Sequence, residues 1–135
     1  MNHIAVLEEV VQRDPRFAYE AYEFVFAALE HTQKLLGRQP DEEEAEDTHH
    51  VSGPELLAGV RDLALREFGL MARTVLRHWG INKTADFGDI VFNLVEAGLM
   101  SKTSQDDRLD FHDVYDLDKA LGEYRIEVPH QAEEA

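Results

Sequence analysis

The residues that could do chemistry in this sequence are scattered histidines and carboxylates. His31, His78 and His112 lie in or beside segments with a helical pattern, where they could approach carboxylates in the folded chain. A lone histidine on a helix is more often a surface residue than a general base, because a base needs a second group that orients it. The sequence contains no Gly-x-Ser-x-Gly, His-Glu-x-x-His, phosphate-loop or Gly-x-Gly-x-x-Gly pattern. We therefore expect a non-enzymatic protein without a cofactor, with a hydrolase or metal enzyme of unrecognised motif as an alternative.

The residues that could bind a metal lack the spacing of a metal site. His49 and His50 follow an acidic run, but adjacent histidines rarely ligate one ion, and structural zinc needs four ligands on a defined frame. The aspartates between positions 106 and 118 lack the alternate spacing and central glycine of a calcium loop. Glu20 and Glu23 fit a solvated helix face better than a carboxylate metal site. Without cysteine, the chain also has no disulfide, thiolate zinc ligand or thiol nucleophile. We expect no metal site.

The most specific local pattern is a helix-turn-helix between residues 79 and 102. Trp79-Gly80-Ile81 ends one helix, Thr84 caps the next, and Gly98-Leu99 ends that one. This pattern resembles the helix-turn-helix of winged-helix regulators, in which the capped helix enters the major groove of DNA. Here the polar stripe of that helix is acidic, and acidic side chains oppose contact with phosphate. We therefore predict a surface that contacts protein. Its candidate residues are Lys83, Asp86, Asp89, Asn93, Glu96 and Lys102.

The charge of the chain also argues against nucleic acid. The net charge is −15, with −8 in residues 1–51, zero in residues 52–104 and −7 in residues 105–135. Such a field repels nucleic-acid phosphate and anionic lipid, favours solubility and could attract a basic partner. We expect a protein partner, for which a basic surface would be complementary. A winged-helix nucleic-acid-binding regulator stays an alternative if a basic face forms from Arg61, Arg66, Arg73, Arg77, Lys83 and Lys102.

The elements that position these residues are helices. Apolar residues recur at helical spacing over residues 4–11, 16–36, 52–68, 70–79 and 84–97. The segment 16–36 is apolar around most of its circumference, which places it in the middle of a bundle. Single helical turns are expected at 106–111 and 116–121, and a short strand at 124–128. The sequence predicts an all-α fold of five to six helices with a helix-turn-helix-like, winged-helix-like second half and at most a short C-terminal strand.

Residues 1–135 are expected to form a single domain, since that length suits one hydrophobic core. Residues 38–50 have no apolar periodicity and predict an acidic flexible linker, and residues 130–135 predict a disordered tail. No apolar run approaches the ~20 residues of a membrane span, and the first residues do not look like a signal peptide. These features favour a cytoplasmic location.

Short motifs over about residues 5–128 also carry a family resemblance. They are His50-Val51-Ser52-Gly53, Glu55-Leu56, Phe68-Gly69, Val75-Leu76, Trp79-Gly80-Ile81, Thr84, Asp86-Phe87-Gly88, Ile90-Val91-Phe92, Gly98-Leu99-Met100, Phe111 and Tyr115-Asp116. On these residues the chain resembles a small protein family restricted to Planctomycetes and Verrucomicrobia, for which no activity is established. The resemblance implies a bacterial, intracellular protein and supplies no mechanism.

Overall fold

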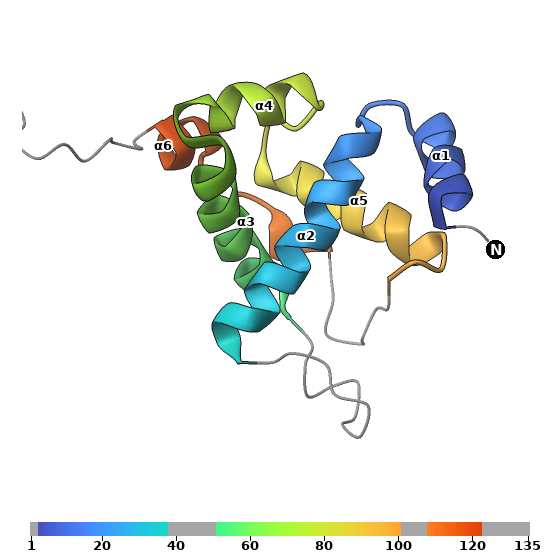
Figure 1. Ribbon diagram of the computed structural model, residues 1–135, viewed down its shortest axis with the longest axis horizontal. Coiled ribbons are helices and arrows are strands. Elements are labelled where there is room, and N and C mark those ends of the chain that lie inside the picture. The colour runs from blue at the N-terminus through green and yellow to red at the C-terminus, as the bar shows by residue number, and fades with distance from the viewer. Residues whose placement is uncertain (1–2, 38–50, 101–107, 123–135) are drawn as a thin grey trace, which may run out of the picture.

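Helices account for the regular structure of residues 3–37, 51–100 and 108–122, which are the residues that the computed structural model describes (Figure 1). The longer elements are α1 (His3–Arg13), α2 (Tyr19–Leu36), α3 (Gly53–Phe68) and α5 (Thr84–Glu96). The shorter ones are α4 (Ala72–His78), α6 (Leu117–Gly122) and the 3-10 turns η2 (Gly69–Met71) and η3 (Arg108–Phe111). The described ranges contain no strand, and the prediction of an all-α fold is confirmed.

The helix α2 lies at the centre of the fold, as its apolar circumference predicts. It packs side by side with α3 and crosses α5, while α1 lies beside its first half and α4 lies across the end of α3 (Figure 1). Its charged residues Glu20, Glu23, Glu30 and Lys34 are all exposed, together with Ala27 and the last residues of the helix. The core that these helices enclose includes Phe17, Tyr22, Val25, Leu57, Val60, Leu76, Ile81, Phe87, Ile90 and Leu94.

The start of α2 differs from the prediction. The helix was expected to begin at residue 16 because proline suits a first helical turn, but it begins at Tyr19. The Asp14 carboxylate accepts hydrogen bonds from the Arg16 guanidinium at 2.8 Å, and the Ala18 N–H donates to the Trp79 carbonyl at 3.1 Å. These two contacts hold residues 14–18 as a turn that joins α1 and α2 to the connection between α4 and α5.

The closest approach of α2 and α3 is at Gly59. A Cβ atom on Gly59 would overlap Thr32 Oγ1 and would lie 2.9 Å from Thr32 Cβ. Thr32 is buried, and its hydroxyl donates to the Ala28 carbonyl at 2.6 Å. The glycine therefore lets the two helix backbones come together without a side chain between them.

The ends of α3 and α4 follow the local signals of the sequence, with one exception. Ser52 and Glu55 form a capping box at the start of α3, in which each side chain accepts a hydrogen bond from the other residue's backbone N–H. Gly80 has φ +95°, and the Ile81 N–H donates back to the Leu76 carbonyl at 2.9 Å, as expected for this helix end. Met71 is an apolar residue of the segment 70–79 that was predicted to be helical, but it is 56% exposed, because Gly69 ends α3 and a 3-10 turn redirects the chain.

Thr84 does not cap α5, contrary to the prediction. The cap position is Lys83, and Thr84 is the first helical residue. The Thr84 hydroxyl instead donates to the Phe111 carbonyl at 2.6 Å and accepts from the Val114 N–H at 3.2 Å. Phe111 packs against Gly88, where a Cβ atom would lie 2.9 Å from the Phe111 Cβ. Thr84 and Gly88 thus bind the returning η3 segment to α5.

Several predictions fall on residues that the structure does not describe. They are the linker at 38–50, the first residues of the turn at 106–111, the strand at 124–128 and the tail at 130–135. The predicted turn at 116–121 is present as α6, where the Asp116 carboxylate accepts from the backbone N–H groups of Asp118 and Lys119. The predicted helix-turn-helix order is also present as α4, a turn and α5, although α5 packs mainly on η3 and α2.

Candidate functional site

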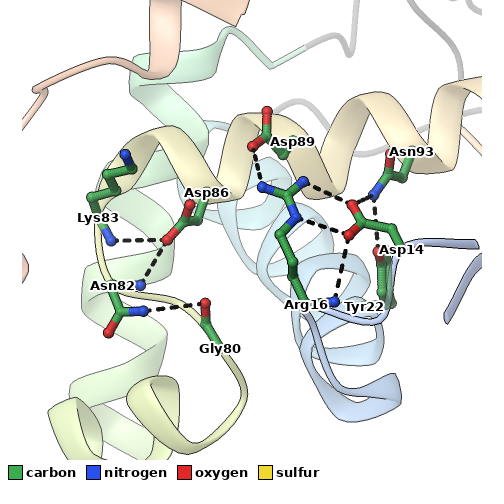
Figure 2. A network of polar contacts seen from close by, with 9 residues as sticks. All are labelled: Asp14, Arg16, Tyr22, Gly80, Asn82, Lys83, Asp86, Asp89 and Asn93. Carbon is green, nitrogen blue, oxygen red and sulfur yellow. Dashed lines mark hydrogen bonds and ion pairs between the residues drawn. The ribbon is translucent and has the colours of Figure 1, made fainter.

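The polar stripe of α5, predicted to be an exposed contact surface, is partly internal. Asp86 is only 7% exposed, so its prediction as a surface residue is wrong. Its carboxylate accepts hydrogen bonds from the backbone N–H groups of Asn82 at 2.8 Å and Lys83 at 3.2 Å (Figure 2). These N–H groups belong to the start of α5, where helical partners are missing and a carboxylate is favoured. Asp86 therefore holds in place the two residues that lead into α5.

The next two residues of the stripe, Asp89 and Asn93, bind the turn between α1 and α2 (Figure 2). Arg16 donates to both oxygens of Asp14 at 2.8 Å and to Asp89 at 3.3 Å. The Asn93 side chain donates to Asp14 at 2.8 Å and to the Tyr22 hydroxyl at 3.0 Å. This polar network is a clamp that fastens the α1–α2 turn to α5.

The ionisation of the clamp fits a structural role. The hydrogen bonds from Arg16 lower the pKa of Asp14 to about 2, and the same pairing raises the pKa of Arg16. Burial raises the pKa of the Tyr22 phenol. These groups therefore keep a fixed charge near neutral pH, and none is poised to exchange a proton there.

Lys83 and Glu96 are the exposed members of the predicted surface within the described ranges, and Lys102 lies outside them. The stripe is thus not a continuous free face, because its middle is covered by the α1–α2 turn. A contact role for Lys83 and Glu96 stays a prediction.

The arginines required for a basic face are engaged within the chain. Arg73 donates to Asp118 at 2.6 Å and to the Ile81 carbonyl at 3.1 Å, and it lowers the pKa of Asp118. Arg77 lies 3.7 Å from the same carboxylate. Arg61 donates to the Ala120 carbonyl at 3.1 Å. These contacts tie α3 and α4 to α6, and they reduce the positive charge available to a phosphate.

Of the three histidines singled out, one is brought to a carboxylate. His31 on α2 lies 2.7 Å from Asp62 on α3, from ring Nε2 to Oδ2. Arg66 donates to the same oxygen at 2.7 Å, as an i,i+4 pair on α3. The hydrogen bond from His31 is the main reason that the pKa of Asp62 is lowered. His78 and His112 are exposed.

His31 also lines an open groove of about 290 Å³ between α2 and α3, here named the α2–α3 groove. Its apolar lining comes from Phe24, Ala27 and Leu63. Its polar lining comes from Glu30, His31 and Lys34 on α2 and from Glu67 on α3. The groove therefore combines an apolar floor with charged banks on two helices that are held in close contact.

Phe24 connects the groove to an aromatic cluster. Its ring centroid lies 5.9 Å from that of Phe68 and 5.7 Å from that of Trp79, and the last two rings meet edge to face at 5.7 Å. Such tilted and edge-to-face contacts are favourable and hold large rings in fixed positions. The cluster joins α2, α3 and the end of α4, so the floor of the groove rests on three elements.

Two other hollows are lined mainly by groups that already serve the fold. One, of about 280 Å³, is lined by the clamp residues Asp14, Arg16 and Asn93 together with side chains of α1 and Glu96. The other, of about 380 Å³, is lined in part by Asp116 and Asp118. Asp116 accepts a backbone N–H at the start of α6, and Asp118 pairs with Arg73. The α2–α3 groove differs because Phe24, Ala27 and Leu63 give it an apolar floor.

The sequence does not indicate this groove, although it contains local signals for some of its parts. The Glu30–Lys34 and Asp62–Arg66 pairs each have the i,i+4 spacing of one helix, but their meeting depends on how α2 and α3 align. A glycine inside a helical pattern is a signal of close backbone approach, so Gly59 could have indicated which faces meet.

Within residues 3–37, 51–100 and 108–122, no three histidine or carboxylate side chains gather closely enough to hold a metal ion. Among the helices of the same ranges, none is long and apolar enough to cross a bilayer. A comparison of the chain with protein-family models, curated proteins and solved structures finds no match. Membership of the planctomycete and verrucomicrobial family therefore stays a prediction.

Proposed function

We propose that the protein is a non-enzymatic interaction module and that it binds a protein partner through the α2–α3 groove. The observation that carries this proposal is the groove itself, with its apolar floor between charged banks. Its volume of about 290 Å³ is at the lower end of the range for small-molecule sites. It suits one or two side chains of a partner better than a cofactor.

The two helices that form the groove support a binding role because they are fixed. The Gly59–Thr32 approach sets their separation, and the His31–Asp62 hydrogen bond joins them beside the groove. A binding site with positions fixed before association loses less conformational entropy when the partner arrives.

A hydrolase has less support from the same residues. A His–Asp pair becomes catalytic when it activates a neighbouring nucleophile. Thr32, the hydroxyl residue next to His31, is only 2% exposed and donates to the Ala28 carbonyl. That hydroxyl is turned into its own helix and is not offered to a substrate.

A nucleic-acid regulator also has less support, since the arginines of α3 and α4 contact acceptors of the same chain. We also propose that the protein acts in the bacterial cytoplasm, because the family resemblance implies a bacterial, intracellular protein.

The test compares two matched substitutions of exposed alanines. Ala27→Arg places a long side chain in the groove, whereas Ala5→Arg adds the same side chain and charge on α1. Both positions are helical and exposed, so we expect both variants to fold, as checked by circular dichroism. Tagged wild type, Ala27→Arg and Ala5→Arg are used to capture partners from the native lysate, and the bound proteins are identified by mass spectrometry.

We expect Ala5→Arg to retain the partner and Ala27→Arg to lose it. For the purified pair, calorimetry should give at least about a 30-fold weaker Kd, which is the loss of one central hot spot. A partner that binds Ala27→Arg as tightly as wild type would contradict the proposed site.

A further inference from the structure

We propose that the occupant of the α2–α3 groove is a basic side chain of the partner, a lysine or arginine next to an apolar anchor. This inference rests on the proposed function and adds the chemistry of the partner to it.

The banks of the groove carry more carboxylates than cations. Glu30 on α2 and Glu67 on α3 lie on opposite sides and are both exposed. Lys34 is the cation of the lining, and it lies 3.9 Å from Glu30. Asp62 adds no free charge, because Arg66 and His31 already bind it. A cation placed between the banks would therefore meet two carboxylates and one ammonium group.

The exposed stripe of α2 extends this acidic bank beyond the groove. Glu20 and Glu23 are exposed on the same helix, so a basic segment that follows α2 meets further carboxylates. The net charge of −15 would increase the rate at which such a segment arrives. The same net charge disfavours a second copy of this chain as the occupant, because two such molecules repel each other.

The apolar lining of the groove suits the methylene groups of a lysine or arginine side chain. The buried Phe24, the half-buried Leu63 and the exposed Ala27 give the groove apolar surface beside its charged side chains. Lysine and arginine can lay their methylene groups on apolar surface while the charged head reaches a polar rim. An apolar anchor beside the basic residue would occupy the remaining apolar surface of the groove.

The experiment uses the full chain and three short blocked peptides that share their leucines. Their other positions are arginine in the first, glutamine in the second and glutamate in the third. Trp79 is the single tryptophan of the chain, and its ring lies 5.7 Å from that of Phe24. Its fluorescence therefore reports on the floor of the groove without a label. We expect the arginine peptide to bind at least about tenfold more tightly than the glutamine peptide, and the glutamate peptide to bind least.

Three variants separate a specific site from general attraction to an acidic protein. Glu30→Gln with Glu67→Gln removes both bank charges and keeps the side-chain shape, so the arginine peptide should bind about 5- to 30-fold more weakly. Glu8→Gln with Glu9→Gln removes two exposed charges from α1 and should change binding by less than about twofold. Lys34→Gln removes the competing ammonium group and should strengthen binding by about two- to fivefold. Circular dichroism checks that all three variants fold.

Three results would overturn the basic occupant and leave the proposed function standing. The first is equal binding of the arginine and glutamine peptides, with both lost in Ala27→Arg. The second is a captured partner that Ala27→Arg loses but the Glu30→Gln and Glu67→Gln double variant retains at full affinity. The third is a Glu8→Gln and Glu9→Gln variant that weakens binding of the arginine peptide as much as the Glu30→Gln and Glu67→Gln variant does, because binding would then follow net charge. Binding of the arginine peptide and of the captured partner by Ala27→Arg at wild-type affinity would instead overturn the groove itself.

Discussion

The close approach of α2 and α3 makes Gly59→Ala the most informative single substitution for the fold. In an ordinary helix, replacing glycine by alanine stabilises by about 1 kcal/mol. Here the new methyl group would overlap Thr32 Oγ1 and would lie 2.9 Å from Thr32 Cβ. Thr32 Cβ is fixed by the α2 backbone, and Oγ1 can move only by giving up its hydrogen bond to the Ala28 carbonyl. Overpacking should therefore cost about 3 kcal/mol, the upper end of its usual range. We expect a net loss of about 2 kcal/mol in the free energy of unfolding.

A double-mutant cycle tests the cause of that loss. Thr32→Ala alone should cost about 1 kcal/mol, because a buried methyl group and a hydrogen-bonded hydroxyl are removed. In the double variant with Gly59→Ala the overlapping oxygen is gone, so the two losses should not add. We expect the double variant to be at least about 1 kcal/mol more stable than the sum of the single losses predicts.

The assay is urea unfolding of the four proteins at one pH, followed by Trp79 fluorescence and by far-ultraviolet circular dichroism. Equal midpoints from the two probes would support two-state unfolding. A Gly59→Ala protein that is more stable than wild type would refute the close approach, since only helix propensity would then act. Additivity within about 0.5 kcal/mol would refute the role of Thr32.

Three further predictions concern the ends of helices and the clamp. Ser52→Ala removes the capping box with Glu55 and should cost about 1 kcal/mol in urea unfolding, and an unchanged midpoint would contradict this. Gly80→Ala should cost at least about 2 kcal/mol in the same assay, because φ is +95° and the new methyl group would overlap the Arg16 carbonyl, so a milder loss would argue against this geometry. The pKa of Asp14 is lower in the folded chain, so its pairing stabilises above about pH 4 and is lost as the pH falls towards 2. Because Arg16 is 57% exposed and solvent screens the pair, Asp14→Asn should cost about 1 kcal/mol at pH 7 and little at pH 2, and equal losses at both pH values would contradict this.

Local signals in the sequence predict the helices well because each signal acts over a few residues. The ends at Gly37, Gly80 and Gly98 follow from glycine's access to positive φ, and all three glycines have it. The cap at Ser52 also needs only its neighbour Glu55. Such features form within one turn of helix, so the sequence is enough to place them.

The errors occur where a distant segment competes for the same polar group. Thr84 has the chemistry of a cap, but its hydroxyl donates to the carbonyl of Phe111. Asp86 and Asp89 have the spacing of a wet stripe, but one accepts the N–H groups at the start of its helix and the other binds Arg16. A helical wheel cannot predict these partners, because they depend on which segments pack against α5.

For the same reason, the sequence predicts contacts of the candidate site within one helix but not the contacts between its two helices. The Asp62–Arg66 pair lies on one helix and could be read from its spacing. The contact between His31 and Asp62 needs the alignment of α2 with α3, and so does the groove beside it. That alignment depends on a glycine facing a buried threonine, which is a packing relation and has no periodic pattern in the sequence.

The contact between the α1–α2 turn and the α4–α5 connection bears on the order in which the chain folds. Its hydrogen bond joins the backbones of Ala18 and Trp79, which are far apart along the chain, so forming it closes a long loop at an entropic cost. Consecutive helices such as α2 and α3 can pair at a lower cost, and we expect them to pair first. This hydrogen bond joins main-chain atoms, so it needs no particular side chain at position 18 beyond a residue that keeps its backbone N–H. If the chain were cut between residues 18 and 79, each fragment would lack the backbone partner of its turn. The two fragments would then have to associate before either could complete its fold.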